Sequence, residues 1–294
     1  MPHVSSPVGS HTPVTGGLAK GGLTYAARVE AEAIQVFVTN PRGWALAAGD
    51  PRQDALLRAH VEEAGLPVFI HTPYLVNMGS PNPQTVALSV ASVAHALARG
   101  AAIGAVGVVM HTGSAVSGGR EAGLRRVREN LLPILGEPPE GAPALLLEPM
   151  AGQGQMLCAR VEELGPYLEA LDRHPKVGVC LDTCHAYAAG HDIATRTGMA
   201  AMLDALAAAT GPGRLRLVHA NDSLDVCGGK KDRHENIGAG HIGADPFGEL
   251  FTHPVSAGVP LIVETPGKAE GHAKDIATLK ALRPSRRAKA TTAR

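Results

Sequence analysis

Six short hydrophobic segments of the chain each end in a side chain that can bind a metal ion. The segments include P-V-F-I-H and A-L-L-L-E, and the residues that end the six are His71, His111, Glu148, Asp182, His219 and Glu264. A single residue of this kind is usually a hydrogen-bonded core or rim residue. Six of them brought together would repel one another or lose their solvation unless a cation held them. The pattern therefore predicts a divalent metal site.

Two polar segments add three more candidate ligands. In D-T-C-H, His185 follows Asp182 by three residues, and a tight turn would aim both at one point. In K-K-D-R-H-E-N, Asp232 and His234 flank Arg233, so an extended loop would place both ligands on one side and the arginine on the other. Catalytic zinc commonly takes about three protein ligands and keeps an open position, so nine ligands with one shared carboxylate fit three ions. Several close ions with open positions suit phosphoryl chemistry.

The elements that must position these ligands alternate between strand-like and helix-like segments. We expect strands at V-G-S-H near residue 10 and at 33–39, 67–72, 106–112, 144–148, 177–182, 215–219 and 260–264, and helices at 51–64, 85–99, 120–135, 158–171, 198–209 and 272–282. This alternation predicts an α/β fold, a single-domain (β/α)8 TIM barrel, with a doubly wound open sheet as the alternative. In a barrel the carboxyl ends of the strands converge on one face, so the six strand-end ligands would meet there, and His11 would line the rim.

Composition and terminal segments narrow the class of protein. Lysine plus arginine and aspartate plus glutamate both number 27, so no global basic charge marks the chain for nucleic acid, although a local basic groove is compatible with this balance. No apolar run reaches the roughly eighteen residues of a membrane span, and the amino terminus lacks the order of a signal peptide. We expect a cytoplasmic protein without a membrane partner. The barrel domain is predicted over residues 1–283, followed by a basic, disordered tail at 284–294.

The cysteines are expected to be reduced and to pack rather than to bind metal. Cys158, Cys180, Cys184 and Cys227 lie at unrelated spacings, which does not suit a disulfide framework. Cys180 shares a strand face with Asp182 and is predicted to lie deeper in the barrel, with Cys184 in the following turn. Thiolates favour closed structural zinc sites, whereas imidazole and carboxylate supply open hydrolytic ones.

Three long motifs resemble those of the endonuclease IV family, the metal-dependent apurinic/apyrimidinic (AP) endonucleases of base-excision repair. They are L-D-T-C-H-A-Y-A-A-G-H-D, K-K-D-R-H-E-N-I-G-A-G-H-I-G and L-E-P-M-A-G-Q-G, and the similarity runs from G-S-H-T to V-E-T-P-G. The resemblance implies a TIM barrel with three zinc ions, with manganese as an option at one site. It also implies cleavage of double-stranded DNA on the 5′ side of an abasic site, leaving a 3′ hydroxyl and a 5′ deoxyribose phosphate, and removal of blocked 3′ ends. The family further implies a monomer that acts at the nucleoid.

The resemblance also distributes the nine ligands over the three ions. It implies His71 and His111 for the first ion, with Glu148 bridging to the second; Asp182, His219 and Glu264 for the second; and His185, Asp232 and His234 for the third. A hydroxide shared by the first two ions would attack phosphorus, and the third ion would stabilise the departing oxygen. Glu148 and Glu264 are the implied catalytic residues, with Glu264 orienting the hydroxide or acting as a base.

For DNA recognition the resemblance points to two loops. Family members turn the abasic sugar out of the duplex. Tyr74 and Leu75, in H-T-P-Y-L, match the residues that wedge into the base stack, and Arg42, in T-N-P-R-G-W, matches the arginine that enters the gap. Without the resemblance, a loop tyrosine packed on its neighbours would be the simpler interpretation of Tyr74.

The chain departs from the family pattern beside two ligands. Thr72 and Pro73 follow His71 where the family usually has aspartate and serine, and Pro149 and Met150 follow Glu148 where it has asparagine and threonine. These changes alter the surroundings of the ligands, which tune metal affinity. They bear on the level of activity rather than on the type of reaction.

Two other functions fit parts of the same pattern. A sugar isomerase or epimerase of the xylose isomerase-like barrels also carries strand-end His, Glu and Asp ligands, but it typically holds one or two metals and would not need His185, Asp232 and His234. A non-catalytic metal-binding or damaged-DNA-binding protein is the second alternative.

Overall fold

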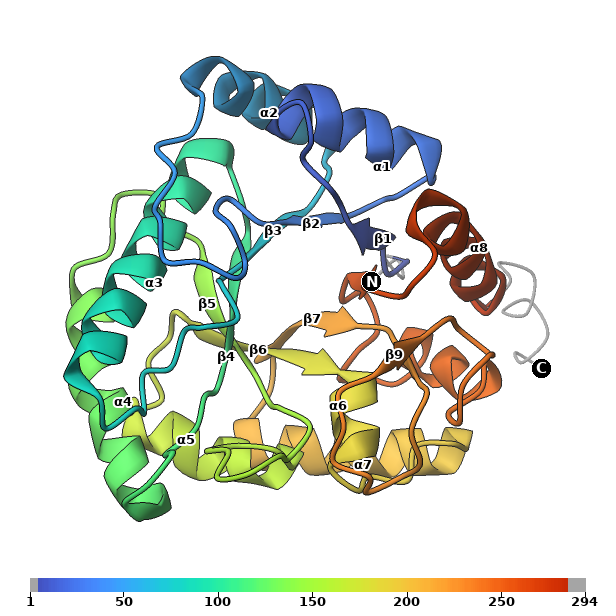
Figure 1. Ribbon diagram of the computed structural model, residues 1–294. Coiled ribbons are helices and arrows are strands. Elements are labelled where there is room, and N and C mark those ends of the chain that lie inside the picture. The colour runs from blue at the N-terminus through green and yellow to red at the C-terminus, as the bar shows by residue number, and fades with distance from the viewer. Residues whose placement is uncertain (1–4, 285–294) are drawn as a thin grey trace, which may run out of the picture.

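Eight parallel strands close into a barrel at the centre of the molecule, surrounded by helices (Figure 1). The computed structural model describes residues 5–284. The strand order around the barrel is β1-β10-β7-β6-β5-β4-β3-β2. The strands are β1 (Val8–His11), β2 (Ile34–Val36), β3 (Val68–His71), β4 (Gly107–His111), β5 (Ala144–Glu148), β6 (Val177–Asp182), β7 (Leu215–His219) and β10 (Leu261–Val263). The predicted closed barrel is confirmed, and the open-sheet alternative is wrong.

The helices form the outer layer, and several begin and end at residues that the sequence marks. They are η1 (Leu18–Leu23), α1 (Thr24–Arg28), α2 (Pro51–Ala64), α3 (Pro83–Ile103), α4 (Gly119–Gly136), η2 (Val161–Glu163), α5 (Leu164–Ala170), α6 (Thr183–Ala188), α7 (Arg196–Thr210), η3 (Asp245–Phe251) and α8 (Lys268–Ala281). Asp50 caps α2 by accepting from the Arg52 amide, Pro51 follows it, and Gly65 ends the helix in a left-handed conformation. The prediction of a helix over 51–64 is therefore confirmed.

The predicted helix over 158–171 is wrong at its amino end. The α-helix α5 begins at Leu164, after the short 3-10 turn η2. The carboxylate of Glu163 accepts from the amides of Ala159 and Arg160, which satisfies these donors outside a helix. Pro166 lacks an amide hydrogen and is tolerated in the first turn of a helix, so its position agrees with a start at Leu164.

Helix α3 corrects the expectation that no segment is long and apolar enough to span a membrane. Its 21 residues meet that criterion by length and composition. The same test is passed by core helices of globular proteins, and 44% of its most apolar stretch is buried. It packs against β3, β4, α2 and α4, and its buried residues include Ser89, Ser92 and Arg99. Its surroundings are those of an outer helix of the barrel.

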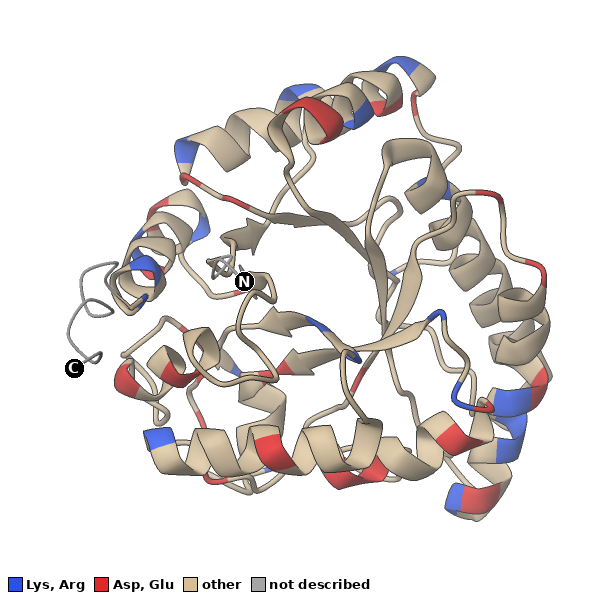
Figure 2. Cartoon of the chain, turned by 180° about the vertical axis from the view of Figure 1, so that it is seen from behind, with Lys and Arg blue, Asp and Glu red and all other residues tan. Residues whose placement is uncertain are grey.

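Charged residues of both signs are interspersed along the outer helices (Figure 2). This distribution agrees with the equal numbers of basic and acidic residues in the sequence. The predicted tail at 284–294 lies, apart from Pro284, outside the described residues. The division into a barrel domain and a tail therefore stays a prediction.

The interior of the barrel is a separate small apolar cluster. It consists of Ala33, Phe69, Val109, Leu146, Cys180, Leu217 and Ile262, packed together and buried. The intervening strand residues belong to the larger core between the strands and the helices. Because side chains alternate along a strand, the residue two positions after each interior residue also faces inward, one layer closer to the carboxyl ends. The predicted position of Cys180 deep in the barrel is confirmed.

Candidate metal centre

The layer above the interior cluster holds the six predicted strand-end ligands. Each follows an interior residue by two positions, as His71 follows Phe69 and Glu148 follows Leu146. Five of the six end a strand, and Glu264 comes directly after β10. The barrel therefore gathers them at its carboxyl-terminal face, as the sequence predicted.

The first ligand group consists of His71, His111 and Glu148. Their candidate ligand atoms lie within 4.8 Å of one another. Glu148 Oε2 is 3.1 Å from His71 Nε2 and 3.5 Å from His111 Nε2. His71 and Glu148 are buried, so water cannot balance the charge of the Glu148 carboxylate.

The second ligand group consists of Glu148, Asp182, His219 and Glu264, again within 4.8 Å of one another. His219 Nδ1 lies 3.1 Å from Glu148 Oε1 and 3.2 Å from Glu264 Oε2. Asp182 Oδ2 is 3.9 Å from the same nitrogen. The two oxygens of Glu148 thus face different groups, which is the geometry of a bridging carboxylate.

The third ligand group, His185, Asp232 and His234, comes from outside the barrel strands. His185 lies on α6 rather than in the predicted tight turn: Asp182 caps this helix by accepting from the His185 amide at 2.9 Å. The hairpin of β8 (Asp222–Ser223) and β9 (His234–Glu235) holds the other two, with Asp232 Oδ1 3.1 Å from His234 Nε2. Arg233 points away to Asp225 at 3.5 Å, so the predicted alternation of sides is confirmed.

Backbone carbonyls orient three of the histidines. Nδ1 of His71 donates to the Thr72 carbonyl at 2.7 Å, and Nδ1 of His185 donates to the Pro149 carbonyl at 3.0 Å. Nδ1 of His234 lies 3.3 Å from the Glu264 carbonyl. With the proton on Nδ1, each ring turns the lone pair of Nε2 toward the site. Two of the family departures, Thr72 and Pro149, therefore contribute carbonyl groups that any residue would supply.

The electrostatics of the third group favour a cation. Burial opposes the charged form of His185, but Asp182 and Asp232 outweigh it and raise the pKa of His185 to about 10. Burial would raise the pKa of Asp232, yet the neighbouring imidazoles of His185 and His234 hold it well below its usual range. At His111, which belongs to the first group, desolvation dominates instead and lowers the pKa to about 4.

The surroundings of His234 Nε2 indicate whether these residues fit a metal ion. Its Nε2 is buried and has no hydrogen-bond partner among the described residues, although it lies 3.4 Å from Asp182 Oδ2 and 3.1 Å from Asp232 Oδ1. An imidazole nitrogen held between carboxylate oxygens without hydrogen-bond geometry suits a cation placed among them. The donor set of imidazole and carboxylate is that of catalytic zinc.

Two cysteines border the ligand groups. Cys180 lies near Glu148 and His219, and Cys184 near Asp182 and His234. Burial raises the pKa of both thiols to about 12. A neutral thiol is a poor ligand, so the expectation that neither binds metal stays in place as a prediction. All four cysteines are free, as predicted.

The structure brings the predicted DNA-binding loops together beside the ligands. The Tyr74 amide donates to the Pro41 carbonyl at 3.0 Å, next to the exposed Arg42. The Tyr74 ring stacks on His111 at 5.9 Å, and Tyr74 and Leu75 keep exposed fractions of 49% and 40%. A pocket of about 360 Å³ is lined by His71, Tyr74, His111, Glu148, His185, Asp232, His234 and Glu264. Tyr74 thus lines the pocket of the candidate site, and the exposed Leu75 follows it in the chain.

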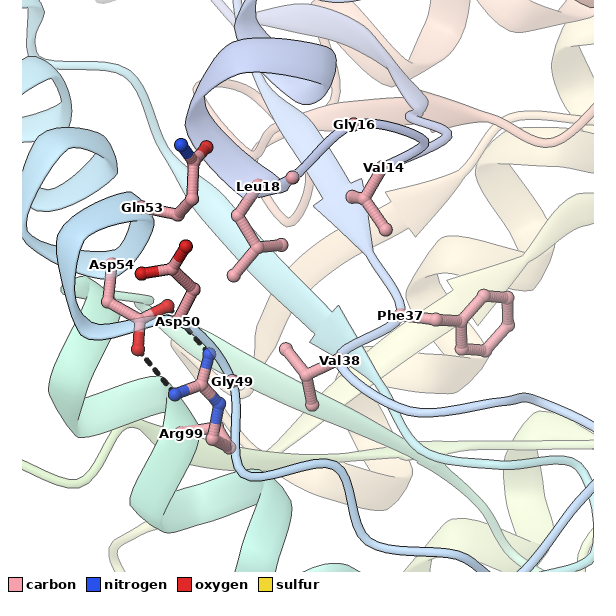
Figure 3. Close-up of a pocket in the computed structure, with 11 residues that line it drawn as sticks. Val14, Gly16, Leu18, Phe37, Val38, Gly49, Asp50, Gln53, Asp54 and Arg99 are labelled. Carbon is pink, nitrogen blue, oxygen red and sulfur yellow. Dashed lines mark hydrogen bonds and ion pairs between the residues drawn. The ribbon is translucent and has the colours of Figure 1, made fainter.

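The sequence did not predict the buried ion pair that holds one end of the loop carrying Arg42. A second pocket, of about 370 Å³, is lined by residues from both ends of this loop, and Figure 3 shows the Asp54–Arg99 ion pair in it. The guanidinium binds both carboxylate oxygens of Asp54 and donates to the Ala48 carbonyl at 3.3 Å. A Cβ on Gly49, which has a φ of +83°, would lie 2.2 Å from this guanidinium. The end of the loop is therefore pressed against a buried arginine.

Sequence reasoning also missed Gln35, a buried amide on β2. Its side chain contacts His219 and Glu264 of the second ligand group. Its position two residues after the interior residue Ala33 was the available signal, because the strand-end ligands share that spacing.

Comparisons with known proteins agree on one family. Residues 23–282 match the family model described as xylose isomerase-like TIM barrel. The probable endonuclease 4 of Streptomyces coelicolor is 59% identical over 281 residues, which cover 95% of each chain. The probable endonuclease 4 of Halothermothrix orenii is 34% identical, covering 94% of this chain and 99% of its own. The crystal structure of endonuclease IV from Thermus thermophilus superposes with a TM-score of 0.82 at 36% identity, covering 94% of this chain and 98% of that one. A D-tagatose 3-epimerase-like protein, 18% identical with a TM-score of 0.70 and coverage of 94% and 96%, shares the fold.

Proposed function

The chain belongs to the endonuclease IV family of xylose isomerase-like TIM barrels, and we propose that it is a zinc-dependent endonuclease specific for abasic sites. It cleaves the phosphodiester on the 5′ side of the site in double-stranded DNA, leaving a 3′ hydroxyl and a 5′ deoxyribose phosphate. It also removes blocked 3′ ends. The observation that carries this proposal is the meeting of three ligand groups in one pocket, with Glu148 shared between two of them.

The nine candidate ligands would hold three ions at the phosphate. His71, His111 and Glu148 would hold the first ion, Asp182, His219, Glu264 and the other oxygen of Glu148 the second, and His185, Asp232 and His234 the third. Zinc, with manganese as an option at one site, would supply a hydroxide at neutral pH and would neutralise charge that develops on the phosphate.

Glu264 would orient the attacking group. Its Oε1 accepts from Gln35, while its Oε2 lies next to His219 Nδ1 and faces the second ligand group. The buried surroundings keep the pKa of Glu264 low, because His219 and His11 outweigh the desolvation of the carboxyl. An ionised carboxylate can hold a proton-bearing nucleophile in line with the phosphate.

The DNA-facing loops would hold the lesion over the pocket. Tyr74 and Leu75 would wedge into the base stack, and Arg42, whose loop is bonded to theirs, would occupy the gap. The protein would act as a monomer in the cytoplasm, at the nucleoid.

The direct test is cleavage of a duplex that carries one tetrahydrofuran abasic analogue. We expect a nick on the 5′ side, a product that a polymerase can extend, and loss of cleavage after prolonged chelation. Glu264→Gln should keep the fold and reduce kcat by about 10² or more. An undamaged duplex of the same sequence is the control.

Two outcomes would replace the proposal. Epimerisation of a free ketose without nicking would favour the sugar isomerase alternative. A D-tagatose 3-epimerase-like protein has the same fold as this chain. Tight binding of the abasic duplex without any cleavage in zinc-loaded protein would favour a damage-binding protein. The third ligand group favours the nuclease, because an isomerase site of one or two metals does not need it.

A further inference from the structure

In the layer of the candidate ligands, two of the eight strands contribute side chains that the ligand groups do not include. These are His11 of β1 and Gln35 of β2, which pair in register. Gln35 follows the interior residue Ala33 by two positions, so it stands in the same layer as the candidate ligands. A Cβ on Gly9, two residues before His11, would lie 1.6 Å from the Ala33 carbonyl oxygen. This close approach of the strands brings His11 and Gln35 side by side.

Gln35 is fully buried, and both ends of its amide contact the second ligand group. Its Oε1 accepts from His219 Nε2 at 2.8 Å. Its Nε2 donates to Glu264 Oε1 at 2.7 Å and lies 3.0 Å from His11 Nδ1. The reverse orientation of the amide would set its carbonyl against the carboxylate and its NH₂ group against the imidazole N–H. The partners therefore fix which way the amide points.

These bonds select the atoms that can face a metal ion. Because the Gln35 carbonyl can only accept, the proton of neutral His219 must lie on Nε2, which leaves the lone pair on Nδ1. Nδ1 is the nitrogen near Glu148 and Glu264. Because Glu264 Oε1 is occupied by Gln35, Oε2 is the oxygen that remains for the site.

We propose that Gln35 is a positioning residue of the metal centre. It fixes His219 Nδ1 and Glu264 Oε2 as the ligand atoms of the second group, and so sets the affinity of that group for its ion and the direction of the Glu264 carboxylate. The part of the proposal that concerns catalysis rests on the proposed nuclease function; the part that concerns metal affinity does not.

The test replaces the amide by an apolar side chain of similar length, in Gln35→Met. The matched control is Gln84→Met, at an exposed glutamine of α3. Zinc affinities are measured by competition with a chromophoric chelator, and the cobalt-loaded proteins are compared by visible absorption. Outer groups of this kind typically change metal affinity about 10- to 100-fold. We expect a loss of that size for one of three equivalents, an altered cobalt spectrum, and unchanged affinity for the other two.

Kinetics and the unfolding of the metal-free protein separate positioning from a general structural role. With the abasic duplex we expect kcat to fall and KM to stay constant in Gln35→Met. Unchanged affinities for all ions would overturn the proposal. So would a uniform weakening that follows a lower Tm of the metal-free variant, and Gln35→Leu repeats the measurement if the methionine variant does not fold. If the wild-type protein does not nick abasic DNA, the zinc and cobalt measurements still decide the role of Gln35.

Discussion

Glu148 belongs to two ligand groups, because its two carboxylate oxygens face different groups. Oε2 faces His71 and His111, and Oε1 faces His219. Four nearby imidazoles compensate for its burial, so the pKa of Glu148 lies well below its ordinary value despite desolvation. A carboxylate that is ionised and buried in this way is prepared for cations on both sides.

The pKa of His185 predicts that metal uptake releases a proton. Asp182 and Asp232 raise this pKa to about 10 against desolvation, so the metal-free protein carries an imidazolium there at neutral pH. A metal needs the neutral ring, so occupation of the third group must displace the proton. We expect the zinc affinity of this group to rise with pH below about pH 10, with the His185 proton contributing about tenfold per pH unit. Calorimetry in two buffers of different ionisation enthalpy counts the protons, and uptake without proton release would contradict the assignment.

The raised pKa of His185 also determines how the stability of the metal-free protein depends on pH. The folded pKa of His185 lies above its ordinary value of 6.5. The interactions of His185 with Asp182 and Asp232 therefore stabilise the fold fully below about pH 6.5, and this contribution is lost as the pH rises toward about 10.

Among the elements, the loop between β2 and α2 depends on a residue of α3. Arg99 pairs with Asp54 of α2 and donates to the loop carbonyl of Ala48, so two outer helices fix the end of the loop that carries Arg42. The Arg99 side chain is buried, which makes this pair different from the exposed ion pairs of the outer helices.

Replacing this arginine should loosen the loop without emptying the metal centre. In Arg99→Met the buried carboxylate of Asp54 loses its partner, which costs about 3–5 kcal/mol of stability. We expect faster hydrogen exchange over residues 39–50 and weaker binding of the abasic duplex, with zinc content unchanged. Arg52→Met, at an exposed arginine of α2, is the control. Unchanged hydrogen exchange of the loop in folded Arg99→Met would show that Arg99 does not hold the loop.

For the whole molecule, the metal centre should link metal binding to folding. The ligands come from seven separate segments, from β3 to the residue that follows β10, so they lie together only in the closed barrel. Ions that bind the folded state alone stabilise it by about 4 kcal/mol each at about 1,000 times the dissociation constant.

Removing the metal should therefore lower the melting temperature. We expect chelated protein to unfold at a Tm lower by about ten degrees or more, and added zinc to restore the original value. Differential scanning calorimetry before and after chelation measures this change. A Tm that is the same with and without metal would mean that the three groups do not hold ions in the folded protein.

The sequence by itself predicted the closed barrel and the nine candidate ligands. Both follow from local patterns: the alternation of strand and helix, a ligand type at the end of six apolar strands, and the three further ligand types in D-T-C-H and K-K-D-R-H-E-N. Barrel closure then brings residues such as His71 and Glu148 together without further information. Their binding of metal stays a prediction.

The tertiary structure alone decided the contacts that depend on residues far apart in the chain. Gln35 and His219 are separated by 184 positions, and Asp54 and Arg99 by 45. Side-chain alternation places Gln35 on the inward face, but its two partners are set by the registers of β1, β2, β7 and β10 around the closed sheet. The proton positions on His185 and His234 follow in turn from the carbonyls of Pro149 and Glu264, which are 36 and 30 positions away in the chain. A hydrogen bond requires atoms within about 3 Å, which no local pattern specifies.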